Sequence, residues 1–157
     1  MEDQVAKLQA RGFAVERIHS GRDRAASRQA CIDYLAGRLH FLFIAPERLR
    51  VPGFPEMLAK RKPTLVCSPS SSMHNGYGYI NVGMHPELMA LGVNVSLGSD
   101  HACSGVVDIV QEMRMCACGY KEARINPRVM PPEQALEMAT LGGAKGVGML
   151  DRIGSIE

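Results

Sequence analysis

Short apolar runs alternate with segments of helical periodicity along most of this chain, and this alternation constrains the fold more than any other feature. Nearly continuous apolar runs such as residues 39–45 are typical of strands inside a parallel sheet, and the helical segments between runs are long enough to cross from one strand to the next. The pattern predicts an α/β protein with a mostly parallel sheet and crossover helices. We expect strands at residues 13–18, 39–45, 64–67 and 93–97, and helices at 2–11, 23–35, 54–60, 86–91, 106–120 and 131–140.

The composition changes near Val66. Residues 1–65 contain 12 basic and 7 acidic side chains, whereas residues 66–157 contain 6 and 9, and 12 of the 16 glycines lie in the second part. A random distribution of charged surface residues would explain the charge difference alone. Because the charge balance and the glycine content change at the same position, the composition favours two segments of different origin or with different partners. We therefore expect two segments, 1–66 and 67–157.

The cysteines and the hydropathy of the chain are typical of a cytoplasmic protein. The five cysteines include no C-x-x-C pair, so the sequence indicates neither a disulfide framework nor a four-thiolate zinc site. No apolar run approaches the roughly 20 residues of a membrane span, and the first residues lack the plan of a signal peptide. We expect a cytoplasmic protein with no membrane partner.

Asp100 is the main candidate for a catalytic residue. It ends the run Gly98-Ser99-Asp100, which follows the predicted strand 93–97. Catalytic groups of α/β proteins lie at the carboxyl ends of parallel strands, although a strand-end aspartate also serves as a helix cap. The turn-forming residues 68–79, which include a serine cluster, predict a loop at the end of another strand. Both roles of Asp100 stay open at this point.

Residues 1–66 resemble the start of the core of RecQ-type ATP-dependent DNA helicases. The first eight residues, MEDQVAKL, are similar to motif Ia, and Ala45 to Leu49 read A-P-E-R-L like the next motif. This resemblance implies a RecA-like lobe that contacts single-stranded DNA. The phosphate-binding loop and the D-E-A-H box that perform ATP chemistry are absent, so we expect residual nucleic-acid binding only. The candidate nucleic-acid-binding residues are Arg22, Arg24, Arg28, Glu47 and Arg48.

Residues 67–157 resemble the C-terminal barrel part of the amidohydrolase superfamily, in its chlorohydrolase and deaminase branch. The similar motifs are C-S-P-S-S-S at 67–72, L-G-S-D at 97–100, E-M-R at 112–114 and Q-A-L-E-M-A-T at 134–140. The resemblance implies a partial TIM barrel, a divalent metal (zinc or iron) and hydrolysis of a C–N or C–Cl bond in a small molecule. It also implies that Asp100 ligates the metal and accepts a proton from the attacking water.

Most metal ligands of that family have no counterpart here. The sixth-strand histidine falls where Val66 or Cys67 stands, and a catalytic zinc needs about three protein ligands. The possible substitutes are His74, His85 and His101. His74 also fits an exposed loop residue, and His101 follows Asp100 directly, so these two neighbours are expected to point apart. His85 is expected to be an extended residue before Pro86.

Three functional hypotheses remain. The chain is an incomplete metal-dependent hydrolase that is inactive by itself, a helicase fragment that binds nucleic acid, or a composite of a RecA-like half and a partial TIM-barrel half without activity. The ends of the chain fall inside family motifs, which favours a composite of fragments. We also expect self-association through exposed sheet edges.

Overall fold

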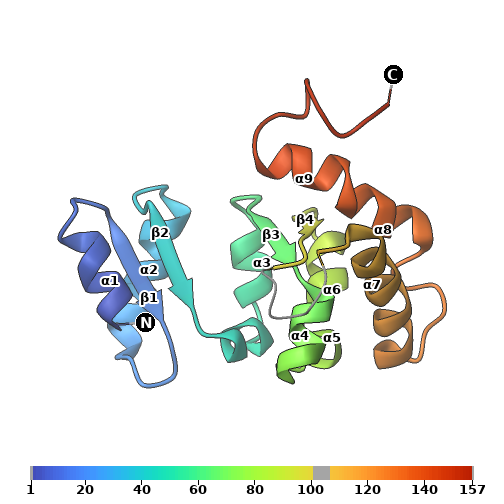
Figure 1. Cartoon of the computed structure of the whole chain (residues 1–157). Helices are drawn as coiled ribbons and strands as arrows, with labels where there is room; N and C mark the ends of the chain where they lie inside the picture. Colours follow the sequence, from blue (N-terminus) through green and yellow to red (C-terminus); the bar gives the residue numbers. More distant parts are fainter. Residues whose placement is uncertain (1, 101–106, 157) are drawn as a thin grey trace. The chain divides into compact units, whose positions relative to one another are not determined.

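The computed structural model describes residues 2–100 and 107–156 (Figure 1). The chain divides into two compact units, Met1–Arg61 and Lys62–Glu157. The two segments expected from composition, 1–66 and 67–157, meet inside a strand of the second unit. Among the described helices, none has the length and apolar character required to cross a bilayer.

The first unit is built on two parallel strands with helices packed against them (Figure 1). β1 pairs with β2 in the register that places Val15 opposite Phe41 and Ile18 opposite Ile44. Ile18 is fully buried with Ala30, Phe54 and Leu58, because β1, α2 and α3 turn apolar side chains toward one another. The elements are α1 Glu2–Gln9, β1 Val15–Ile18, α2 Arg24–Leu35, β2 Phe41–Ile44, the 3-10 helix η1 Pro46–Arg50, and α3 Phe54–Ala59.

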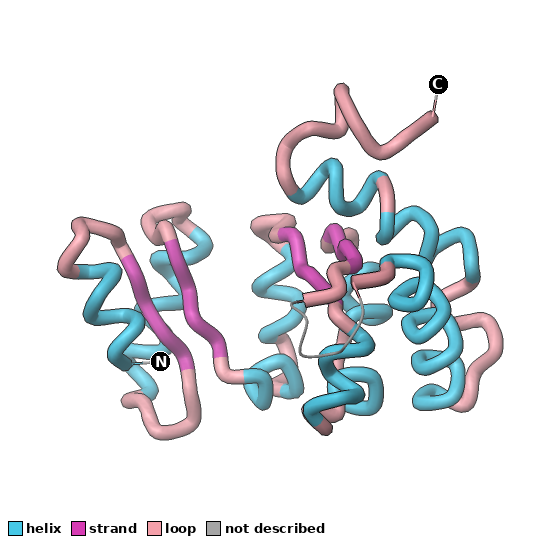
Figure 2. Tube along the Cα trace, in the orientation of Figure 1, coloured by secondary structure: helices cyan, strands magenta, loops and turns pink. Residues whose placement is uncertain are grey.

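The second unit also contains two parallel strands, which are short (Figure 2). β3 pairs with β4 so that Thr64 lies opposite Asn94 and Cys67 opposite Leu97. The carboxyl ends of both strands therefore lie at the same edge. The elements are β3 Thr64–Cys67, α4 Pro69–Asn75, α5 Tyr79–Val82, α6 His85–Ala90, β4 Asn94–Leu97, α7 Ile109–Arg124, α8 Pro132–Ala139 and α9 Leu141–Gly146.

A close approach of helix α9 to strand β4 fixes one side of the second unit. A Cβ atom added at Gly142 would lie 2.8 Å from the carbonyl oxygen of Val95, closer than side-chain atoms come to backbone. Asn94 bridges the same junction, because its side-chain N–H donates to the Gly142 carbonyl at 2.9 Å. Glycine at position 142 thus lets α9 pack directly on β4.

Parallel strands joined by crossover helices are confirmed in both units. All four predicted strands are present, three of them with shorter bounds and the strand at 64–67 with the predicted bounds. The prediction of a loop over residues 68–79 is wrong, because residues 69–75 form α4. Pro69 stands at the first turn, where its fixed φ angle favours a helix, and Gly76 ends the helix at a φ of 66°. His85 is not an extended residue either, since it begins α6 and is buried.

Candidate functional site

Asp100 lies at the shared carboxyl edge of β3 and β4, directly beyond the end of β4. The hydroxyl of Ser71, on α4 after β3, donates a hydrogen bond of 2.8 Å to Oδ2 of Asp100. Asp100 has a φ of 59°, in the left-handed region that aspartate enters more readily than most residues. Such backbone conformations gather at functional sites. The segment after β4 thus presents the exposed carboxylate of Asp100, and the buried Ser71 fixes one of its oxygens.

Glu112 anchors the serine cluster to helix α7. Its carboxylate is completely buried and accepts a hydrogen bond of 2.9 Å from the backbone N–H of Ser70 and a second one from the Ser70 hydroxyl. Asn75 donates from its side chain to the carbonyl of Ser71 at 2.9 Å. These contacts hold the first turn of α4, and with it the serine that contacts Asp100, against the core of the unit.

A second buried polar cluster joins His85, Tyr120 and Cys67. The Tyr120 hydroxyl lies 2.5 Å from Nδ1 of His85 and 3.8 Å from Sγ of Cys67, and the His85 ring stacks on Tyr79. Burial lowers the pKa of His85 to about 4, so the imidazole is neutral at pH 7. Hydrogen bonding to Cys67, together with burial, raises the pKa of the Cys116 thiol. Cys67 is thus a buried core cysteine.

The described residues do not by themselves provide a metal site. No group of three His, Cys, Asp or Glu side chains among residues 2–100 and 107–156 is arranged to hold an ion. His74 is exposed on α4, and His101 lies outside the described residues. Asp100 is the one predicted ligand that the structure places at the carboxyl edge of the strands, and one carboxylate is fewer than the three ligands of a catalytic zinc.

The arginines predicted to bind nucleic acid are brought together within the first unit. Arg22, Arg24, Arg28 and Arg48 line one cleft, although they come from the β1–α2 turn, from α2 and from η1. Glu47 is exposed and does not line this cleft. The structure therefore brings the four predicted arginines together, and their binding of nucleic acid stays a prediction.

The amidohydrolase family model matches residues 56–157. This chain belongs to the amidohydrolase family. The match includes Asp100, the serine cluster and Glu112, and the family is generally metal-dependent. The resemblance of residues 67–157 to this family is thereby confirmed at the family level, whereas the helicase resemblance of residues 1–66 and a composite origin gain no support from the comparisons.

Curated relatives of this amidohydrolase are deaminases and hydrolases. A 5-methylthioadenosine/S-adenosylhomocysteine deaminase of Syntrophobacter fumaroxidans is 41% identical over 102 residues, which are 64% of this chain and 23% of that protein. An S-triazine hydrolase of Gordonia rubripertincta is 37% identical over 84 residues, 53% of this chain and 18% of the relative. The chain spans about a quarter or less of these relatives' lengths.

Solved deaminase structures share the fold. An adenosine deaminase from Xanthomonas campestris, solved with bound zinc, is 25% identical at a TM-score of 0.62, and the match covers 99% of this chain and 37% of that one. The guanine deaminase of E. coli matches 66% of this amidohydrolase at 22% identity and a TM-score of 0.56. The first match includes residues of the first unit, and it lends the expected RecA-like half no support.

The partners of Asp100 in this amidohydrolase were not predicted from its sequence. The sequence predicts turns for the serine cluster, and it marks Glu112 only as part of the E-M-R motif. Parallel pairing of the two predicted strands is the signal that would have predicted these partners. Parallel β3 and β4 place residues 68–71 and 98–100 at one edge, and a glutamate in the first turn of α7 lies within reach of the same edge.

Proposed function

We propose that this chain carries part of the active site of an amidohydrolase that hydrolyses a C–N bond in a small molecule, with deamination of a purine-type substrate as the leading reaction. The observation that carries the proposal is the Asp100 carboxylate at the shared strand edge, held by Ser71. Family membership and the deaminase relatives support the bond type. The S-triazine hydrolase relative keeps other C–N substrates within the same class.

Asp100 is proposed to act as the proton acceptor for the attacking water. A carboxylate accepts this proton well when it is fixed in one orientation and stays ionised. The hydrogen bond from Ser71 serves the first of these needs, because it fixes Oδ2 in one orientation. The buried Ser70–Glu112 contact then acts indirectly, since it keeps α4 and therefore Ser71 in place.

We propose that the described residues supply one of the groups that C–N hydrolysis requires, the Asp100 carboxylate, and that the other zinc or iron ligands and the substrate pocket come from elsewhere. By itself the chain is therefore expected to release ammonia from 5-methylthioadenosine no faster than buffer containing Zn²⁺. It is also expected to bind less than one equivalent of zinc in equilibrium dialysis. Tight stoichiometric zinc binding would contradict a partial site.

A segment exchange tests the proposed reaction. Residues 56–157 replace the matched part of the Syntrophobacter fumaroxidans deaminase, and this segment-swapped enzyme is assayed for ammonia release from 5-methylthioadenosine. The parent deaminase is the positive control, and circular dichroism checks folding. A folded segment-swapped enzyme that releases ammonia supports the proposal, whereas a folded enzyme without ammonia release from 5-methylthioadenosine, S-adenosylhomocysteine or an s-triazine contradicts it.

We also propose that the chain self-associates through sheet edges. Within the described residues, each sheet consists of two strands, so every strand has a neighbour on one side only. On β3, the side chain of Val66 is 60% exposed. Apolar strands with open edges favour pairing with another chain.

A further inference from the structure

The first unit contains an arginine-lined cleft that the proposed hydrolase function does not use. We propose that this arginine cleft, defined by Arg22, Arg24, Arg28 and Arg48, binds the phosphate or diphosphate group of a small molecule. The cleft has a volume of about 680 Å³, within the range of small-molecule sites. It lies wholly within residues 19–51, away from Asp100 in the sequence and in a different unit.

The regular spacing of helix α2 gives the cleft one of its walls. Arg24, Ser27, Arg28 and Cys31 all line it, and their spacing of three or four residues places them on one face of the helix. The amino-terminal end of α2 therefore belongs to the cleft. Two guanidinium groups and a hydroxyl from one helix face are hydrogen-bond donors suited to the oxygens of a phosphate.

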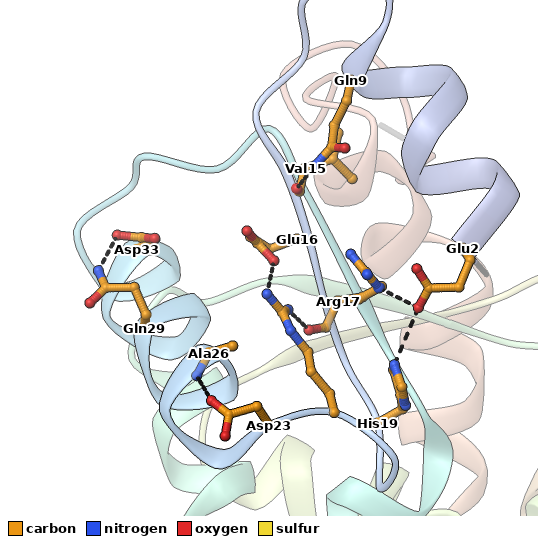
Figure 3. Close-up of polar contacts among 11 residues, drawn as sticks. Glu2, Gln9, Val15, Glu16, Arg17, His19, Asp23, Ala26, Gln29 and Asp33 are labelled. Atoms are coloured by element: carbon orange, nitrogen blue, oxygen red, sulfur yellow. Dashed lines mark hydrogen bonds and ion pairs between the residues drawn. The ribbon is translucent and has the colours of Figure 1, made fainter.

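Three carboxylates near the cleft are already engaged. In Figure 3, Glu2 lies between Arg17 and His19, and the Asp23 carboxylate accepts from the backbone N–H of Ala26 at 2.9 Å. Glu16 forms an ion pair of 2.6 Å with Arg22. The acidic groups around the cleft thus stabilise other elements, and they neutralise one of its four arginines.

Three arginines of the cleft remain available to an anion. Among the described residues of this unit, Arg24, Arg28 and Arg48 take part in no ion pair. The Nε atom of Arg48 is buried and forms no hydrogen bond there, while its guanidinium stacks over the Phe54 ring at 5.6 Å. A buried donor without an acceptor is costly, which sets Arg48 apart from an ordinary surface arginine.

The charge and the lining of the cleft indicate a small ligand rather than a strand of nucleic acid. Three unpaired guanidinium groups around one cleft match the two or more negative charges of a phosphate monoester or a diphosphate. A nucleic-acid track combines a continuous basic groove with aromatic side chains that stack on bases. The lining residues of this cleft include no Phe, Tyr or Trp.

Calorimetric titration of the full chain with inorganic pyrophosphate tests the proposal. At low salt we expect saturable binding with one site, weakened about 10-fold or more by Arg28→Gln because a charge-assisted contact is lost. Arg11→Gln removes an equal charge from an exposed position outside the cleft, and it is expected to change the affinity less than about twofold. Arg48→Lys keeps the charge but removes the planar, forked guanidinium, and it should weaken binding as well.

Two further measurements complete the test. Alkylation of Cys31, which lines the cleft, should slow several-fold in the presence of pyrophosphate or adenosine diphosphate. A 15-residue oligothymidylate with a terminal phosphate should displace pyrophosphate from the cleft no better than a single phosphate monoester does. Absence of saturable pyrophosphate binding, equal weakening by Arg28→Gln and Arg11→Gln, or oligothymidylate binding that pyrophosphate does not displace would each overturn the proposal.

Discussion

Glu112 on α7 accepts hydrogen bonds from both the backbone N–H and the hydroxyl of Ser70 on α4, although 42 residues separate the two in the sequence. The next residue along α4, Ser71, donates to Asp100. One buried carboxylate therefore orders the turn that fixes the candidate catalytic carboxylate. The consecutive residues Ser70 and Ser71 therefore connect the buried Glu112 carboxylate to Asp100.

Removing the Glu112 carboxylate is expected to destabilise the second unit. Glu112→Ala leaves the N–H and the hydroxyl of Ser70 buried without an acceptor, which costs about 2–4 kcal/mol in free energy of unfolding. Glu122→Ala, at an exposed position of the same helix, should cost less than about 0.5 kcal/mol. Urea unfolding followed by tyrosine fluorescence measures both. Equal midpoints for the two variants would show that the buried contact does not stabilise the unit.

Stability should fall as the pH drops below about 6.5, because His85 is buried as the neutral imidazole. The unfolded chain takes up a proton with a pKa near 6.5, whereas the pKa of His85 is about 4 in the folded protein. Its contribution is therefore intact above pH 6.5 and is lost progressively toward pH 4, by roughly 3 kcal/mol in total. Of its charged neighbours, Glu87 raises this pKa and Arg124 lowers it.

The variant His85→Gln isolates this effect. Urea midpoints measured at pH 7.5, 6 and 5 should decline for the natural chain and decline less for His85→Gln, which has no proton to gain at this position. Parallel decline of both proteins would assign the pH dependence to other groups. If His85→Gln is less stable at every pH, the prediction is still tested, because it concerns how much the urea midpoint changes with pH and not the midpoint at one pH.

Part of this architecture follows from the sequence. The strand at 64–67 is predicted with the bounds that the structure has, because a short β-branched and apolar run between breakers leaves little choice. The helix at 69–75 was missed because serine and proline favour turns locally, and burial of Ser70, Ser71 and Ser72 against the unit's core overrides that preference. Local preferences carry no information on such tertiary burial.

The residues of the candidate sites are likewise predictable from the sequence only in part. Asp100 is predictable as a strand-end carboxylate, and the helical spacing of Arg24 and Arg28 places them on one face. The partnership of Ser70 with Glu112 is not predictable in this way, because it depends on how α7 packs on α4. The joining of Arg48 to α2 likewise depends on tertiary packing of η1 in the first unit. Residues far apart in sequence meet through packing that periodicity does not encode.

Thiol reactivity should follow burial. In a Cys103→Ser variant, which removes the cysteine outside the described residues, Cys118 is exposed, Cys31 is half-buried, and Cys67 and Cys116 are buried. Titration with a chromogenic disulfide reagent is expected to give one fast thiol, one slower thiol, and two that react only after addition of denaturant. Rapid reaction of all four would contradict the buried Cys67–Tyr120 cluster.

Self-association should depend on Val66. Size-exclusion chromatography is expected to give an elution volume that falls with protein concentration, and Val66→Lys on β3 should shift the chain toward the monomer. Val107→Lys is the matched control, because Val107 is 75% exposed but lies outside the strands. A natural chain that elutes as a monomer at all concentrations would rule out association through this edge.

The initial rate of ammonia release from 5-methylthioadenosine by the segment-swapped enzyme tests the central role of Asp100 most directly. Asp100→Asn removes the proton acceptor and should slow the reaction at least about 100-fold. Asp108→Asn, which keeps an oxygen to cap α7, should stay within about threefold of the unchanged segment. Equal rates for Asp100→Asn and Asp108→Asn, in proteins with the same circular dichroism, would contradict a catalytic role for Asp100.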